Sequence, residues 1–170
     1  GIVIECCQDE PWFDEVSEAL ALFVPGGEGY YLNEGALASE LGGPDRALAL
    51  TCDVTEWDQV ASAVEQTLHR FGRIDVAFAN AGFGAVRGFL NESPEHWRTM
   101  ILTNVYGAAL TIRATVTALE ATSGHLLVTG SVAGHVPIEG SVYSATKHAV
   151  RAMTESARKE LHAKGIRVTL

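Results

Sequence analysis

Tyr143 and Lys147 stand four residues apart in the segment Tyr-Ser-Ala-Thr-Lys, and Ser131 lies twelve residues before the tyrosine. Free tyrosine titrates near pH 10, so it is a poor proton carrier at neutral pH. On one helical face, a lysine four positions further on places a cation near the phenol and favours the phenolate. The Ser131 hydroxyl is suited to hold a substrate oxygen beside it. The three residues predict a proton-transfer site.

The elements that must position these groups alternate along the chain from about Ala36 onward. Short apolar runs predict strands, and Thr55-Glu56-Trp57-Asp58 has the form of a capping box before a helix that Gly72 ends. Ser93-Pro94 predicts the start of a second helix. The predicted strands are Arg46–Cys52, Ile74–Ala79, His125–Thr129 and Ile166–Leu170, and the two later helices are 94–119 and 141–163.

This alternation predicts an α/β fold, a Rossmann-like doubly wound parallel sheet in three α/β/α layers. Ligands of such sheets bind at the carboxyl ends of the strands. Asp53, Asn80-Ala81-Gly82 and Ser131 all fall just past predicted strand ends. Their coincidence at one edge of the sheet is a stronger indication of a site than any one of them.

The first 35 residues fit this rhythm less well. Ile2–Cys6 is compatible with a strand, Pro11–Val24 with a helix and Tyr30–Leu32 with a short strand. We therefore expect an atypical N-terminal segment over residues 1–35, followed by a domain over residues 36–170 that carries the candidate catalytic residues.

Composition and charge exclude several classes of protein. The 170 residues are 47% hydrophobic and 19% charged, which is typical of one globular domain. A formal charge of −9 disfavours nucleic acid and anionic membrane surfaces as partners. No apolar run approaches the roughly 20 residues of a membrane span, and no signal peptide is evident, so a cytoplasmic location is expected. Three cysteines without metal-ligand spacing indicate reduced thiols.

Five motifs together resemble the short-chain dehydrogenase/reductase family, in order and in mutual spacing, over roughly residues 36–170. They are Asp53-Val54, Asn80-Ala81-Gly82, Asn104, Ser131 and Tyr143-x-x-x-Lys147. The resemblance implies an oxidoreductase that interconverts an alcohol and a ketone or aldehyde with NAD or NADP. A small-molecule alcohol or carbonyl compound is then the expected substrate.

The resemblance also implies a role for each motif. Tyr143 is the expected general acid/base, and Lys147 is expected to favour its phenolate and to bind the nicotinamide ribose. Ser131 is expected to orient the substrate oxygen, and Asn104 to hold a water in a proton relay. Asp53 and Val54 are expected at the adenine, and Asn80, Ala81 and Gly82 along the cofactor.

Each motif has a simpler alternative. Taken alone, Asp53 is better explained as a cap of the turn toward Thr55, and Asn80-Ala81-Gly82 is also suited to form only a turn. Ser131 alone fits a cap, and the scattered histidines lack the spacing of metal ligands. A hydrolase built on Ser131 is disfavoured, because the Gly-x-Ser-x-Gly elbow is missing.

The chain departs from the family pattern at both ends. The glycine-rich pyrophosphate turn expected near 6–26 is replaced by Cys6–Trp12, where Asp9 and Glu10 have the wrong charge for a phosphate ligand. The continuation expected after Leu170 is also missing. Two explanations remain: a fragment of an ordinary reductase, or a divergent, non-catalytic relative that acts as a dimerisation module. The family implies a homo-oligomer formed through the helices 94–119 and 141–163.

Overall fold

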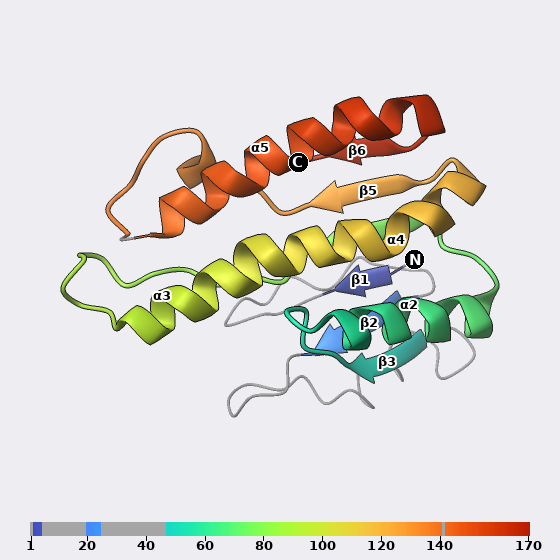
Figure 1. Ribbon diagram of the computed structural model, residues 1–170, viewed down its shortest axis with the longest axis horizontal. Helices are drawn as coiled ribbons and strands as arrows, with labels where there is room; N and C mark the ends of the chain where they lie inside the picture. The colour runs from blue at the N-terminus through green and yellow to red at the C-terminus, as the bar shows by residue number, and fades with distance from the viewer. Residues whose placement is uncertain (1, 5–19, 25–46, 141) are drawn as a thin grey trace.

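A computed structural model of the chain describes residues 2–4, 20–24, 47–140 and 142–170. Six strands form one parallel sheet in the order β3-β2-β1-β4-β5-β6 (Figure 1). The strands are β1 Ile2–Ile4, β2 Leu20–Val24, β3 Ala47–Thr51, β4 Val76–Ala79, β5 His125–Val128 and β6 Arg167–Thr169.

The strand order reverses direction between β1 and β4, which is the switch point of a doubly wound sheet. Val3 of β1 is in register with Leu22 of β2 and with Phe78 of β4. All arrowheads in Figure 1 point toward the same end of the molecule, where the loops after β4 and β5 lie. The predicted Rossmann-like α/β fold is therefore confirmed.

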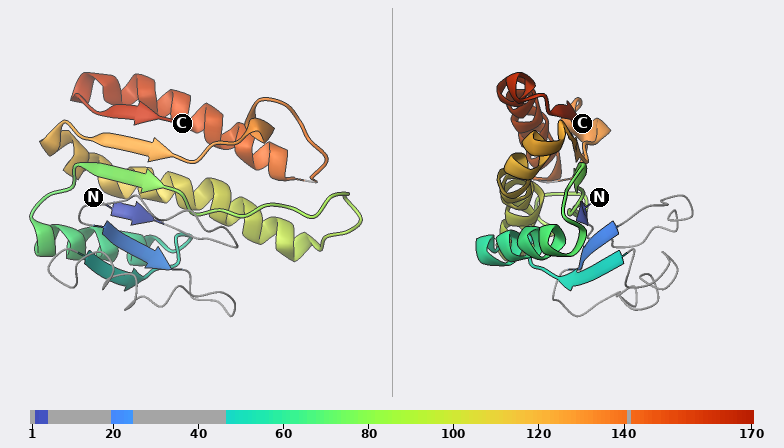
Figure 2. Two further views of the ribbon diagram at one scale, coloured as in Figure 1. Left: turned by 180° about the vertical axis from the view of Figure 1, so that it is seen from behind. Right: turned by 90° about the vertical axis from the view of Figure 1, so that its right-hand side faces the viewer.

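The described helices cover one face of this sheet, as the side view in Figure 2 shows. They are α2 Trp57–Phe71, α3 Pro94–Ile101, α4 Ala108–Thr122 and α5 Tyr143–Leu161. The core between helices and sheet is aliphatic, with Val60, Leu119, Leu126 and Val150 almost wholly buried. The second helical layer was predicted from segments that lie outside the described residues.

Two details of the sequence-based assignment are wrong. Leu20–Val24 was predicted as the end of a helix and is strand β2, paired with β1 and β3. A short apolar run fits either structure, and its place between two strands decides the outcome. The capping box before α2 does not form either, because Glu56 is the N-cap without a side-chain bond and the Thr55 hydroxyl donates to Asp53 at 2.8 Å.

The other helix boundaries follow the predicted signals. Ser93 caps α3 by accepting from the His96 amide at 3.1 Å, and Gly72 ends α2 with a φ of 77°. The long helix predicted over 94–119 is α3 and α4 joined by a π-helical segment, Leu102–Gly107. Wider π turns are frequent at functional sites, and this one contains Asn104.

No helix in the described part of the chain is long and apolar enough to span a membrane. Cys52 lies in the core with 1% of its surface exposed. Burial raises the pKa of its thiol to about 11. The thiolate is therefore suppressed at neutral pH, and Cys52 is an unreactive core residue.

Candidate active site at the carboxyl edge of the sheet

Tyr143 and Lys147 occupy the first turns of α5 and face each other. The Lys147 ammonium lies 5.8 Å from the centroid of the Tyr143 ring. Only 6% of Lys147 is exposed, and its Nζ donates to the Thr129 carbonyl at 3.0 Å. Burial lowers the pKa of Lys147, because desolvation disfavours the charged form. A buried cation is thus held between α5 and the end of β5.

Asn104 connects α5 to the loop after β4. Asn104 is 2% exposed, and its carboxamide accepts from the Phe83 amide at 3.0 Å and donates to the Phe83 carbonyl at 3.0 Å. Its Nδ2 also donates to the Thr146 hydroxyl at 3.1 Å, and that hydroxyl donates to the Tyr143 carbonyl at 2.7 Å. The amide in the π-helical segment is therefore bonded into the same cluster as Tyr143 and Lys147.

Asn80 and Ser131 mark the ends of the two central strands of the site. The Thr129 hydroxyl donates to Asn80 Oδ1, and the Thr129 amide donates to the Ala79 carbonyl at 3.0 Å. These bonds hold the ends of β4 and β5 together. Ser131 caps a short 3₁₀ turn by accepting from the Ala133 amide at 3.1 Å.

The turn after Ser131 packs tightly on α5 beside Lys147. A Cβ placed on Gly134 would come within 2.7 Å of the Lys147 backbone oxygen, closer than side chains tolerate. The segment that begins at Ser131 therefore rests against the helix turn that carries Lys147.

Asp53 and Val54 lie beyond the end of β3, the edge strand three positions from β4, and Val54 contacts the π-helical segment that carries Asn104. Asp53 Oδ1 accepts from the Thr55 amide at 2.9 Å, and its amide donates to Gln59 at 2.8 Å. Val54 is 4% exposed and packs so close to Gly107 that a Cβ there would lie 2.7 Å from Val54 Cγ2. Asp53 therefore caps the turn toward Thr55, as its simpler alternative predicted.

Four contributors to the site were not predicted. The Thr129 carbonyl and the Phe83 backbone act through main-chain atoms, which residue type does not reveal. Thr146 lies inside the Tyr-x-x-x-Lys segment, and only its position opposite Asn104 gives it a role. Glu92 accepts from the Val86 amide in the loop after β4. In the described ranges, no group of three or more His, Cys, Asp or Glu residues could hold a metal ion.

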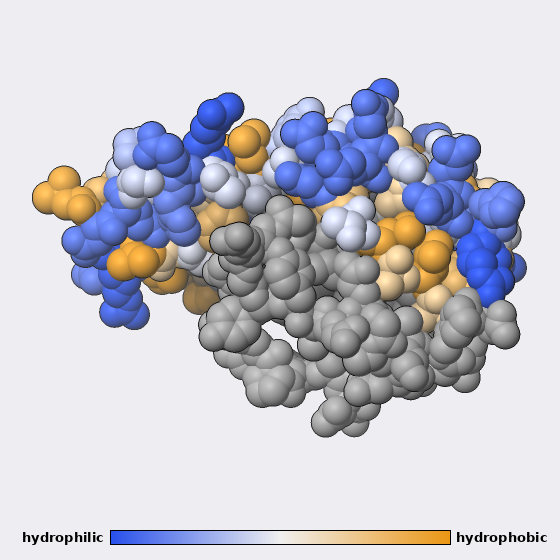
Figure 3. Space-filling view, turned by 90° about the horizontal axis from the view of Figure 1, so that it is seen from below, coloured by the Kyte–Doolittle hydropathy of each residue, from blue (hydrophilic) through white to orange (hydrophobic). Residues whose placement is uncertain are grey.

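Exposed apolar side chains border this end of the molecule. They come from the loop after β4 and the loop after β5, and Figure 3 shows apolar side chains projecting at that end. The residues are Val86, Phe89, Leu90, Val132, Val136 and Ile138, of which Leu90 is 99% exposed. Such side chains favour apolar over charged groups in a ligand.

Gly82→Ala tests the packing of the Asn104 amide. A Cβ at Gly82 would lie 2.9 Å from Asn104 Oδ1. Asn104 cannot yield easily because three hydrogen bonds hold it, so we expect a loss of about 1–3 kcal/mol in the free energy of unfolding. Gly84→Ala is the matched control, since a Cβ there meets nothing within 4 Å. Urea unfolding measures both, and equal stability of the two variants would contradict this packing.

Comparison with known proteins agrees with the α/β fold. A sequence profile for the short chain dehydrogenase family matches residues 31–170. An uncharacterized oxidoreductase of Staphylococcus saprophyticus is 39% identical over 120 residues, covering 69% of this chain and 49% of the relative. A diacetyl reductase, (S)-acetoin forming, of Staphylococcus epidermidis is 35% identical over 126 residues, covering 72% and 49%.

A solved structure also resembles the chain. The crystal structure of a short-chain type dehydrogenase/reductase from Mycobacterium marinum matches with a TM-score of 0.74 at 29% identity, covering 89% of this chain and 61% of that one. The chain spans about half the length of the curated relatives it matches. Because the family profile matches most of the sequence, the chain belongs to the short-chain dehydrogenase family of oxidoreductases.

Proposed function

We propose that the protein interconverts an alcohol and a ketone or aldehyde with NAD or NADP. The observation that carries this proposal is the buried Lys147 ammonium beside the Tyr143 ring. Among the described residues, the Thr129 carbonyl is the only hydrogen-bond acceptor that Lys147 reaches. An ammonium has three donors, so the described residues leave two of them for a ligand. Burying a cation costs free energy. A buried lysine that still has donors available therefore indicates a role in binding a ligand.

In this proposal Tyr143 is the general acid/base. Its hydroxyl gives a proton to the carbonyl oxygen during reduction and takes the proton of the alcohol during oxidation. Lys147 stabilises the phenolate by charge, Ser131 orients the substrate oxygen, and Asn104 belongs to the proton relay. A nicotinamide held by these residues would supply the hydride chemistry, and the protein would supply its placement and a proton.

The candidate cofactor residues lie along the carboxyl ends of the strands, with Lys147 toward one side and Asp53 and Val54 toward the other. This spread suits a ligand as long as a dinucleotide. The two remaining donors of Lys147 suit the hydroxyls of the nicotinamide ribose. Asp53 and Val54 follow β3, and strands β2 and β1 lie between β3 and β4. At ordinary strand spacing, β3 and β4 are therefore about 14 Å apart. A long ligand lying along this edge would meet Asn80, Ala81 and Gly82 between its ends. The pyrophosphate turn falls on a part of the chain outside the described residues.

Cofactor titration tests the proposal directly. The purified protein is titrated with NADH and separately with NADPH while the fluorescence of the reduced nicotinamide is followed. We expect saturable binding of at least one of them and turnover with uncharged ketones such as diacetyl, the compound named for the relative. A folded protein that neither binds cofactor nor turns over would support the non-catalytic alternative.

One observation favours an interface with a second copy of the chain, an open groove between α4 and α5. Its lining includes Ile112, Val116 and Met153, which are only partly buried. We propose that this surface packs against a second copy of the chain, with or without catalysis.

Val116→Glu tests this interface. A charge in the groove is expected to convert the dimer to monomer in sedimentation equilibrium, because an unpaired carboxylate is costly to bury. Thr117→Glu places the same charge on the exposed face of α4 and is the control. A wild-type monomer across the micromolar range would contradict the proposed assembly.

A further inference from the structure

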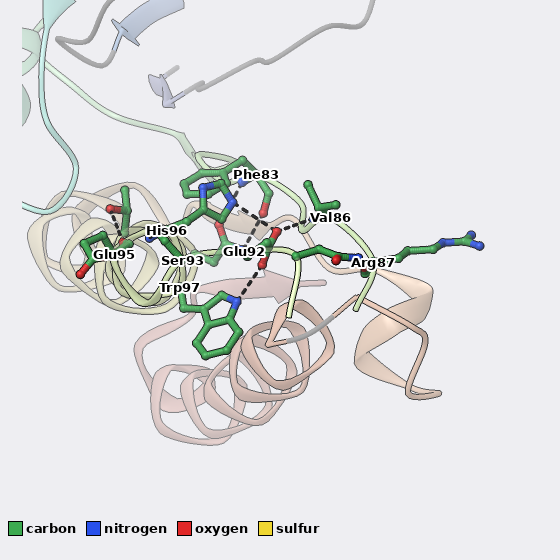
Figure 4. A network of polar contacts seen from close by, with 11 residues as sticks. Phe83, Val86, Arg87, Glu92, Ser93, Glu95, His96 and Trp97 are labelled. Atoms are coloured by element: carbon green, nitrogen blue, oxygen red, sulfur yellow. Dashed lines mark hydrogen bonds and ion pairs between the residues drawn. The ribbon is translucent and has the colours of Figure 1, made fainter. Parts of the chain in front are cut away.

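Glu92 is a buried carboxylate outside the predicted catalytic set. It precedes Ser93, the N-cap of α3, and only 2% of its side chain is exposed. In Figure 4 its carboxylate lies among Val86, His96 and Trp97, two of which belong to α3. Keeping a carboxylate out of water is unfavourable unless donors compensate. Its partners therefore indicate what the residue does.

Those partners join the loop after β4 to the first turn of α3. The Val86 amide donates to Glu92 Oε1, and the Trp97 indole donates to Oε2 at 2.8 Å. His96 Nε2 lies 3.5 Å from Oε1, close enough for an ion pair when the imidazole is protonated. One carboxylate thus connects the loop backbone with two side chains of the helix.

The loop between Val86 and Asn91 buries too little of its own surface to be held in place by packing. Every residue from Val86 to Asn91 is exposed, and Gly88 has a φ of 94°. Its internal bonds, such as Asn91 Nδ2 to the Arg87 carbonyl at 2.6 Å, do not reach α3. Phe89 contacts the Trp97 ring edge-on at 5.8 Å, but the polar ties to α3 converge on Glu92.

The first turn of α3 also contacts Phe83, whose backbone is bonded to Asn104 of the candidate active site. The His96 ring meets the Phe83 ring edge-on at 5.2 Å, and the Phe83 amide and carbonyl both bond to Asn104. A contiguous path therefore runs from Glu92 through His96 and Phe83 to Asn104. A loop that moves away from α3 would release the backbone that holds the Asn104 amide.

We propose that Glu92 is a positioning residue, whose buried carboxylate fixes the loop after β4 and, through Phe83, the orientation of Asn104. This inference rests on the proposed function for its kinetic consequences. Glu92 touches no reacting atom, and its effect passes through the loop that borders the substrate and through the relay amide.

The kinetic test compares Glu92→Ala and Glu92→Gln with Glu95→Ala, an exposed glutamate in the first turn of α3. Glu92→Ala is expected to lower kcat/KM by about tenfold or more, with a higher KM for the carbonyl substrate and a lower kcat, because buried donors lose their acceptor. The dissociation constant of the reduced cofactor that binds, NADH or NADPH, should change by less than about twofold. Glu92→Gln retains one acceptor oxygen and should recover part of the loss.

A merely structural role predicts a different pattern. If Glu92→Ala only reduced the folded fraction, kcat would fall in proportion while KM stayed at the wild-type value. That result, or kinetics equal to those of Glu95→Ala, would overturn the proposal.

Amide hydrogen exchange separates failure of this inference from failure of the proposed function, because it requires no turnover. In Glu92→Ala, the Val86 and Phe83 amides should both exchange about tenfold faster or more, while the amides of β5 keep wild-type rates. Faster exchange at Val86 with an unchanged rate at Phe83 would overturn the proposed path to Asn104, whatever the enzyme assay shows.

Discussion

Replacing Tyr143 with phenylalanine is expected to lower kcat by about 100- to 10,000-fold, because the substitution removes the proposed proton donor and keeps the ring. The backbone carbonyl of Tyr143 still accepts from Thr146, so the start of α5 should be unchanged. Turnover is measured as the absorbance change of NADH or NADPH with saturating ketone. Affinity for the reduced cofactor, followed by fluorescence, should remain within a few-fold of wild type.

Tyr106→Phe is the matched control. Tyr106 lies in the π-helical segment two residues from Asn104, and 47% of it is exposed. It should lose no more than a small fraction of activity. Full activity of Tyr143→Phe would rule out the phenol as the acid/base, whereas equal losses in both variants would indicate a general effect on the fold.

The second large effect is expected for Lys147→Met. Methionine fills a similar volume without charge, so the core beside α5 stays packed while the cation near the Tyr143 ring is lost. We expect kcat/KM to fall by about 100-fold or more, because a preorganised charge is removed from a site shielded from water. The KM for the cofactor should rise as well, since the ribose loses its proposed donors. Steady-state kinetics at several cofactor concentrations measure both quantities.

The same variant has a characteristic effect on stability against pH. Burial lowers the pKa of Lys147 in the folded state, while the unfolded chain keeps an ordinary lysine. Between these two pKa values the unfolded chain binds more protons, so the contribution of Lys147 to stability rises with pH in that window. The melting temperature of wild type minus that of Lys147→Met should therefore increase toward pH 10.

Lys159→Met provides the control on the same helix. Lys159 is exposed near the end of α5, so its removal should change neither kinetics nor the pH trend of the melting temperature. A difference between wild type and Lys147→Met that stays constant from pH 7 to pH 10 would mean that the buried ammonium is not desolvated as the structure indicates.

Much of the fold could be predicted because its signals are local. Ser93-Pro94 and Gly72 mark helix ends through caps that need only neighbouring residues. The strands β3, β4, β5 and β6 were predicted within two residues because each is a short apolar run between helices. Leu20–Val24 was assigned wrongly because five apolar residues carry no decisive period, and only pairing with β1 and β3 makes them a strand.

The candidate site also has a part that could be predicted from the sequence and a part that could not. Residue types and spacing were enough to propose Asn104, Ser131, Tyr143 and Lys147 as candidates, and their catalytic roles stay predictions. They did not reveal the main-chain partners, the Thr129 carbonyl and the Phe83 backbone, because every residue carries those atoms.

By itself, the sequence determined the family, the parallel α/β architecture and the identity of the candidate acid/base, since each depends on motif order or on local periodicity. Only the tertiary structure decided that the Lys147 ammonium is buried, that Asn104 bonds to Phe83 and Thr146, and that Glu92 ties a loop to α3. Desolvation and long-range hydrogen bonds depend on which segments meet in space. A carboxylate such as Glu92 looks like any surface glutamate until the elements around it have packed.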